Sequence, residues 1–234
     1  MRRVRTSPKS GMDPSVERVK VLVLGDSGVG KSAAVNLICT GKPANRARPS
    51  TIGCNVEVKL HDYKPGTNSQ RTFFVELWEI GGNAGHAQAR RVFYKSVHGV
   101  ILVYDLTNSK SHDNLKMWLA DAFSQRERAH FDAETFADLQ VPVLVIGTKA
   151  LQKTERRGLT IADFCGAEEL LIDSFSETSH GLDPGSSNAV KLSYFFDKVI
   201  EKRYFSESIQ SSPPTCVGDR RRPATSPRYL QHLD

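Results

Sequence analysis

The sequence has few cysteines and no long apolar run, and each absence disfavours a class of protein. Its four cysteines, Cys39, Cys54, Cys165 and Cys216, lie far apart and form no C-x-x-C pair. This spacing disfavours a zinc site or a disulfide framework and fits a reducing compartment. No apolar stretch approaches the roughly 20 residues of a transmembrane helix. We therefore expect a cytoplasmic protein.

Net charge is absent from the middle of the chain. The formal net charge is +6, and all of it comes from the two ends. Residues 1–20 hold six basic and two acidic side chains, and residues 201–234 hold six and four. A nucleic-acid-binding domain would carry its basic excess on the folded body. The distribution therefore predicts no nucleic-acid partner.

Composition also bounds the domain organisation. A length of 234 residues suits one domain with extensions. Residues 1–17 are basic and are predicted to be a disordered extension, in preference to a transit peptide, because they offer no apolar amphipathic face. Residues 205–234 are rich in Ser, Pro and Arg and are predicted to be a disordered tail. Residues 18–204 are left to form the domain.

One stretch near the start carries the clearest chemistry. The valine-rich run 19–24 is typical of a strand buried on both faces, and it leads directly into Gly-Asp-Ser-Gly-Val-Gly-Lys-Ser at 25–32. This matches G-x-x-x-x-G-K-[ST], in which glycines let backbone N–H groups wrap a phosphate chain before a helix begins. Lys31 can reach the outer phosphates, and the Ser32 hydroxyl can bind Mg²⁺. The alternative is a glycine-rich turn that matches by chance. The predicted phosphate-binding residues are Asp26, Ser27, Gly28, Val29, Gly30, Lys31 and Ser32.

The rest of the domain alternates between strand and helix patterns. The predicted strands are 54–60, 71–78, 99–104, 141–147 and 171–175, and the predicted helices are 31–40, 109–128, 160–170 and 188–204. This alternation predicts an α/β fold, doubly wound, with a mostly parallel sheet and one antiparallel hairpin. Ligands of such sheets bind at the carboxyl ends of the strands.

Residues 18–204 resemble the Ras superfamily of small GTPases. The phosphate loop at 25–32 resembles the Rab form, and the strings at 61–64, 185–193 and 195–204 resemble a Rab-like branch in particular. The resemblance implies the P-loop small-GTPase fold, binding of GTP or GDP with Mg²⁺, and a switch that reports the third phosphate.

The resemblance assigns roles to two further residues. Thr51 stands where the family has the first-switch threonine that closes on Mg²⁺, so Ser32 and Thr51 are the expected metal ligands. Gly82 stands where the family has the second-switch glycine whose N–H senses the γ-phosphate. Without this context, Thr51 is equally well a strand-edge threonine and Gly82 a turn glycine.

Two departures from the family affect hydrolysis. Glu79 stands in place of the second-switch Asp and is one methylene longer. Asn83 stands in place of the Gln that orients the attacking water and is one methylene shorter. We therefore assign no catalytic residue and expect slow turnover at most.

The base-reading boxes also depart from the family pattern. The box Thr148–Leu151 lacks its usual Asp, and Leu151 cannot accept hydrogen bonds from guanine. Lys149 can still lay its stem along the base, and Glu155 could supply a carboxylate if its loop folds back. The last box corresponds to Ser176–Thr178 and is degenerate. The nucleotide contacts expected here are Thr148, Lys149, Ala150, Glu177 and Thr178.

The sequence thus supports a guanine-nucleotide-binding regulatory switch or scaffold with slow GTP hydrolysis. The Rab-like resemblance implies protein effectors or regulators of small GTPases, a role in their regulation or in trafficking, and self-association as a homodimer. No stable membrane anchor is expected, because Cys216 lies eighteen residues before the last residue. The alternative is a pseudo-GTPase, an interaction module with little nucleotide dependence. An efficient P-loop hydrolase of another class is disfavoured by Asn83.

Overall fold

The computed structural model describes residues 17–45, 49–123, 141–152, 160–177 and 181–205. The predicted N-terminal extension and C-terminal tail lie almost wholly outside these residues, as do Glu155 and Thr178. None of the helices in the described part of the chain is both long and apolar enough to cross a lipid bilayer.

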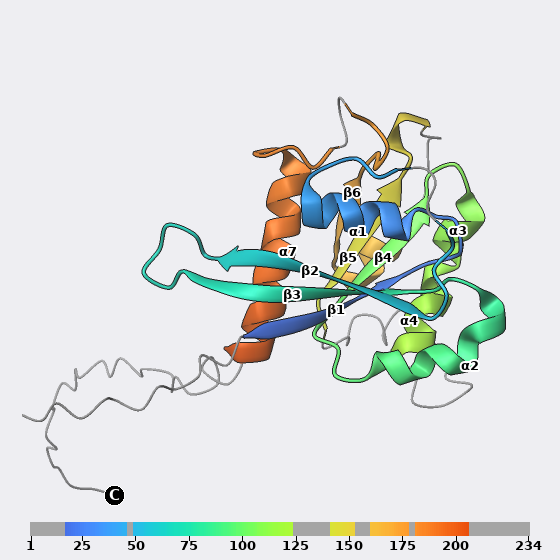
Figure 1. Cartoon of the computed structure of the whole chain (residues 1–234), viewed down its shortest axis with the longest axis horizontal. Helices are drawn as coiled ribbons and strands as arrows, with labels where there is room; N and C mark the ends of the chain where they lie inside the picture. Colours follow the sequence, from blue (N-terminus) through green and yellow to red (C-terminus); the bar gives the residue numbers. More distant parts are fainter. Residues whose placement is uncertain (1–16, 46–48, 124–140, 153–159, 178–180, 206–234) are drawn as a thin grey trace, which may run out of the picture.

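Six strands form one sheet in the order β2-β3-β1-β4-β5-β6 (Figure 1). The antiparallel pair is β2–β3, and every other neighbouring pair is parallel. The predicted α/β fold, with its mostly parallel sheet and one hairpin, is therefore confirmed. The strands are β1 (Arg18–Leu24), β2 (Cys54–Tyr63), β3 (Arg71–Ile80), β4 (Gly99–Asp105), β5 (Val143–Thr148) and β6 (Glu168–Leu171).

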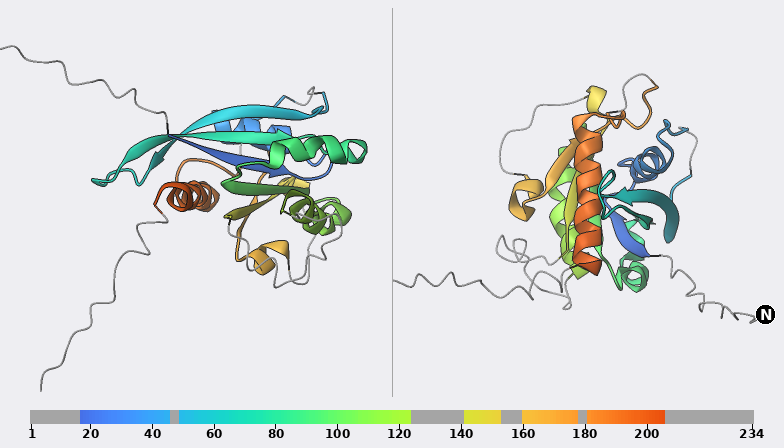
Figure 2. Two further views of the ribbon diagram at one scale, coloured as in Figure 1. Left: turned by 90° about the horizontal axis from the view of Figure 1, so that it is seen from below. Right: turned by 90° about the vertical axis from the view of Figure 1, so that its left-hand side faces the viewer.

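Helices pack on both faces of this sheet (Figure 2). One apolar cluster joins the sheet to α1 (Lys31–Thr40) and α7 (Ser187–Tyr204). A second cluster joins it to α4 (Leu115–Phe123) and α6 (Ile161–Cys165). The shorter elements are η1 (Ala84–His86), α2 (Ala87–Arg90), η2 (Arg91–Tyr94), α3 (Ser109–Asp113) and η3 (Ala150–Gln152).

Burial follows the sequence pattern in the central elements. All seven residues of β4 are buried, as its continuous apolar run predicts for a strand covered on both faces. In α7 the buried side chains recur at the predicted helical spacing, and they are Leu192, Phe195, Phe196, Val199 and Ile200. The centre of the sheet is thus packed on both faces, and it positions the loops at the ends of its strands.

The chain after residue 160 differs from prediction. The predicted helix 160–170 ends at Cys165, because Gly166 takes a left-handed conformation (φ 56°) and caps it. Strand β6 then begins at Glu168, so the predicted strand 171–175 is wrong. As a result, residues 172–177 form a loop at the carboxyl end of β6.

The predicted helix 109–128 also differs in detail. It is interrupted at Asn114, which separates α3 from α4, and it is described only as far as Phe123. The N-cap of α3 is Asn108, which makes no side-chain hydrogen bond to the helix. Ser111 of α3 is buried and accepts a hydrogen bond from the backbone N–H of Asp105 (3.0 Å).

Candidate nucleotide-binding site

The loop between β1 and α1 follows a tight path that only glycine permits at two positions. A Cβ atom at Gly25 (φ +148°) would lie 2.1 Å from the carbonyl oxygen of Val103. Gly30 (φ +96°) is the N-cap residue of α1. The ten-residue helix α1 therefore begins at the loop, with its first backbone N–H groups available to an anion.

The side chain of Lys31 folds back over this loop. It is only 5% exposed, and its Nζ donates hydrogen bonds to the carbonyl oxygens of Gly25 and Asp26 (2.8 Å each). Burial lowers the pKa of Lys31 to about 8, although the carboxylates of Glu79 and Asp26 oppose this shift. The ammonium group is thus held where outer phosphates are expected.

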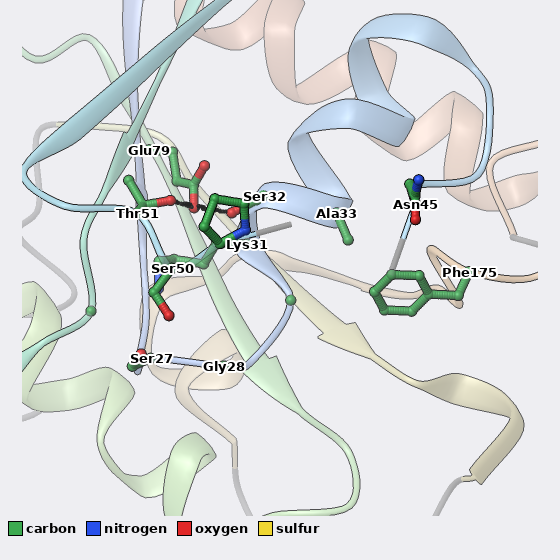
Figure 3. Close-up of a pocket in the computed structure, with 13 residues that line it drawn as sticks. Ser27, Gly28, Lys31, Ser32, Ala33, Asn45, Ser50, Thr51, Glu79 and Phe175 are labelled. Carbon is green, nitrogen blue, oxygen red and sulfur yellow. Dashed lines mark hydrogen bonds between the residues drawn. The ribbon is translucent and has the colours of Figure 1, made fainter. Parts of the chain in front are cut away.

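Three oxygen-bearing side chains converge beside Lys31 (Figure 3). Ser32 Oγ donates to Glu79 Oε1 (2.5 Å), and Thr51 Oγ1 donates to the same oxygen (2.9 Å). The two hydroxyl oxygens lie 3.3 Å apart. These residues come from α1, from the loop before β2 and from the end of β3, so the fold brings together groups distant in sequence.

This cluster suits a magnesium ion. Glu79 is 2% exposed, and its second oxygen, Oε2, has no hydrogen-bond partner among the described residues. A buried carboxylate oxygen without a partner is costly, and a hard cation that takes oxygen ligands would satisfy it. The two predicted metal ligands, Ser32 and Thr51, do lie together. The longer side chain of Glu79 reaches both of them.

The segment after β3 lies against the phosphate loop. A Cβ atom at Gly82 would lie 2.4 Å from the backbone N of Ser27, so only glycine fits there. Asn83, by contrast, is exposed and does not line the cavity. Its Oδ1 accepts a hydrogen bond from the N–H of Gly85 (2.9 Å). The side chain at the position of the water-orienting Gln is therefore used in a local turn.

A cavity of about 160 Å³ lies beside Lys31, Ser32 and Glu79. The sequence reasoning missed part of its lining, including Asn45 and Phe175. Phe175 was missed because its loop was assigned to a strand. The lining residues are Ser27, Gly28, Gly30, Lys31, Ser32, Ala33, Asn45, Pro49, Ser50, Thr51, Glu79, Gly82 and Phe175.

Two of the predicted phosphate-loop residues serve structural contacts instead. The Asp26 carboxylate accepts hydrogen bonds from Asn114 Nδ2 (2.7 Å) and Trp118 Nε1 (2.8 Å), so it is held against α4. The Val29 side chain is buried in the core. Both residues can offer only their backbone to a phosphate.

The predicted base-reading box lies at the ends of β4 and β5. Thr148 Oγ1 donates to the carbonyl oxygens of Val29 (2.6 Å) and Tyr104 (3.0 Å), which fixes β5 to the phosphate loop. Lys149 Nζ forms an ion pair with Asp105. Burial alone would raise the pKa of Asp105, but hydrogen bonds from Lys149 and Thr107 outweigh it and hold this pKa below its usual value.

No guanine-reading carboxylate stands in this box. Leu151 is 71% exposed. Four predicted contacts, Thr148, Lys149, Ala150 and Glu177, do not line the cavity.

Comparison with known proteins agrees with this geometry. The profile of the family described as "Ras of Complex, Roc, domain of DAPkinase" matches residues 20–150. Rab-like protein 3 of Bos taurus is 48% identical over 211 residues, covering 82% of this chain and 88% of that protein. Rab-like protein 3 of Danio rerio is 46% identical over 228 residues, covering 89% and 95%. Small GTPase LIP1 of Arabidopsis thaliana is 32% identical over 244 residues, covering 92% and 71%. The chain therefore belongs to the Ras superfamily of small GTPases, in the group of the Rab-like protein 3 relatives.

Proposed function

We propose that this protein is a guanine-nucleotide-dependent regulatory switch with slow intrinsic GTP hydrolysis, and that it acts through protein partners. The observation that carries the proposal is the convergence of Lys31, Ser32, Thr51 and Glu79 on one cavity, with the backbone of Gly82 against the same loop. The residues expected to bind the phosphates and the two expected switch segments thus lie at the same cavity.

The residues that converge on this cavity have distinct roles toward the nucleotide. The N–H groups at the start of α1 and the Lys31 ammonium bind the phosphates. Ser32, Thr51 and Glu79 would hold Mg²⁺, which when bound neutralises charge on the phosphate oxygens. Thr51 and Gly82 belong to the two switch segments, so loss of the third phosphate changes the contacts of both segments.

Slow hydrolysis follows because none of the described residues that line the cavity is suited to orient the attacking water. Asn83 is short, and its amide oxygen is occupied by the turn at Gly85. Glu79 is the only carboxylate among the described residues of the lining, and it holds the two hydroxyl groups. A misplacement of about 1 Å of a catalytic group costs on the order of a hundredfold in rate. Attacking water is therefore poorly oriented without a second protein.

Exposed apolar side chains near both switches support action through partners. Ile52, next to Thr51, is 83% exposed, and Val92, in η2, is 65% exposed. Large exposed apolar groups at segments that respond to nucleotide suit effectors or regulators of small GTPases, including regulators that act in trafficking. A second copy of this chain is a further candidate partner. The free thiols of Cys39, Cys54 and Cys165 support a cytoplasmic location.

The alternative is a pseudo-GTPase that serves only as an interaction module, and the exposed Leu151 favours it. Nucleotide released by denaturing the purified protein, identified by chromatography, separates the two readings. We expect GDP or GTP, and single-turnover hydrolysis of bound GTP that is slow in the wild type. Release of no nucleotide, together with no Mg²⁺-dependent binding of added GTP, would support the pseudo-GTPase. A rate typical of activator-stimulated relatives, measured without any activator, would contradict slow turnover.

A further inference from the structure

We propose that the base of the bound nucleotide stacks on Phe175, and that this contact contributes affinity for guanine and adenine nucleotides alike. The inference rests on the proposed function, because it assumes that the phosphates bind at Lys31 and Ser32. It names a residue that supplies base affinity in a site whose base-reading box, Thr148–Leu151, contains no carboxylate.

The position of Phe175 in the cavity carries the argument. Its ring lines the same cavity as Lys31 and Ser32, although it lies more than 140 residues later in the chain. Figure 3 shows the ring beside Asn45, beyond Ala33 and at the end of the cavity away from Thr51 and Glu79. A nucleotide whose phosphates lie between these ends extends its base toward the ring.

The backbone around Phe175 is held on two sides. The N–H of Ala44 donates to the carbonyl oxygen of Ser174 (2.9 Å), which ties this loop to the segment after α1. The N–H of Ile172 donates to the carbonyl oxygen of Gly147 (2.9 Å), and the N–H of Phe175 donates to Asp173 Oδ1 (3.1 Å). The backbone that carries the ring is thus held in place, and the ring itself is partly exposed and lines the cavity.

The chemistry of an aromatic ring explains why the proposed stacking does not distinguish guanine from adenine. Every purine has a π face, so stacking contributes affinity without reading the base edge. Two side chains of the base-reading box do not read that edge: Leu151 is an exposed hydrocarbon, and Lys149 is paired with Asp105. The ligand class is therefore purine nucleoside diphosphates and triphosphates, held by phosphate contacts and stacking.

Calorimetric titration of nucleotide-free protein with Mg²⁺ and GDP, ADP or inorganic pyrophosphate tests this inference. Stacking accounts for about 5- to 150-fold in Kd per base. We expect Phe175→Ala to weaken the binding of GDP and of ADP by the same factor within this range. The affinity for pyrophosphate should be unchanged. Phe175→Trp, which keeps an aromatic face, should retain the affinity for both nucleotides.

The other outcomes overturn the inference in distinguishable ways. Unchanged GDP and ADP affinity in Phe175→Ala would show that the base does not contact the ring. Equal weakening of pyrophosphate would show that Phe175 only supports the fold, and a loss confined to GDP would show guanine-specific recognition. Wild-type protein that binds pyrophosphate but neither nucleotide more tightly would also refute stacking. Wild-type protein that binds none of the three would refute the proposed function itself.

Discussion

At the scale of single residues, the buried amine of Lys31 should make phosphate binding depend on pH. Because the pKa of Lys31 is about 8, its amine is neutral in a fraction of the protein molecules at pH 8.5. A bound phosphate favours the charged form of the amine. Binding of GDP at pH 8.5 should therefore take up protons, and affinity should fall as pH rises above 8. Calorimetry in buffers of different ionisation enthalpy measures this uptake.

Lys31→Arg is the matched control for proton uptake, because a guanidinium stays charged throughout this range. Uptake should vanish in that variant. A wild-type binding enthalpy that is independent of the buffer, or the same uptake in Lys31→Arg, would show that Lys31 does not titrate on binding.

Glu79 should determine how tightly the site holds Mg²⁺. Replacing it by Gln removes the charge while keeping the length of the side chain. We therefore expect the Mg²⁺ concentration that is needed to retain the nucleotide to rise about 10- to 100-fold. Release of a fluorescent GDP analogue at a series of Mg²⁺ concentrations measures this. Glu79→Asp, the shorter carboxylate, should lie between wild type and Glu79→Gln. Identical Mg²⁺ curves for wild type and Glu79→Gln would remove Glu79 from the metal site.

Leu151 is the residue at which a carboxylate should add selectivity for guanine. A carboxylate there would accept two charge-assisted hydrogen bonds from guanine, each contributing about 1.5–3 kcal/mol and not additive. We expect Leu151→Asp to tighten the binding of GDP on the order of a hundredfold and to leave the affinity for ADP unchanged. Titration of both nucleotides against both proteins measures this. Wild-type protein that already excludes ADP, together with no gain for GDP, would show that another group reads the base.

At the scale of secondary-structure elements, Arg90 connects the second switch to the phosphate loop. Its Nε donates to Asp121 Oδ2 of α4 (2.8 Å), and its guanidinium lies 4.2 Å from the ring centroid of Trp118. Trp118 in turn donates to the carboxylate of Asp26. Tyr94 OH donates to the same oxygen of Asp121 (2.9 Å). Movement of α2 thus changes contacts that reach the phosphate loop.

Loss of the Arg90 contacts should loosen the second switch without unfolding the domain. We expect Arg90→Ala to increase amide hydrogen exchange across residues 84–94, because no described side chain of α2 or η2 is fully buried and Arg90 is one of the groups that tie this segment to α4. Arg91→Ala is the matched control, since the Arg91 Nε lies 3.9 Å from Asp121 and its side chain is 50% exposed. Equal exchange in the two variants would show that Arg90 does not anchor this segment.

Elements with strong local signals were predictable from the sequence, and β6 was not. The strand-loop-helix around residues 19–40, the apolar run of β4 and the periodicity of α7 each have a physical cause within their own residues. Strand β6, with the sequence Glu-Glu-Leu-Leu, consists of good helix formers. It is a strand because it pairs with β5, with Leu144 opposite Glu168 and Gly147 opposite Leu171. That pairing is a tertiary effect, which local propensity cannot show.

The candidate site likewise has one part that the local sequence predicts and another part that depends on the tertiary fold. The phosphate loop was predictable from its spacing, whereas the reach of Glu79 to Ser32 and Thr51 depends on where three elements end. The pairing of Lys149 with Asp105 depends on β4 lying next to β5 in register, with Asp105 opposite Thr148.

At the scale of the whole molecule, α7 joins the two ends of the described domain. Tyr204 OH accepts from the N–H of Arg18 (3.0 Å) and donates to its carbonyl oxygen (2.9 Å). Glu201 binds the hairpin through Tyr63 OH (3.0 Å) and Lys64 Nζ (2.7 Å). The helix therefore clamps β1 and the β2–β3 hairpin. These contacts hold together the edges of the fold that carries the candidate site.

The central claim is that this fold binds nucleotide through its phosphate loop, and calorimetric titration of Mg²⁺ and GDP into nucleotide-free protein tests it most directly. Wild-type protein should bind GDP, and Lys31→Ala should weaken binding on the order of tenfold to a hundredfold, since a charge-assisted hydrogen bond contributes about 1.5–3 kcal/mol. Lys110→Ala, at an exposed lysine of α3, should bind as wild type does. Absence of GDP binding by the wild type, or equal affinity in wild type and Lys31→Ala, would contradict the account.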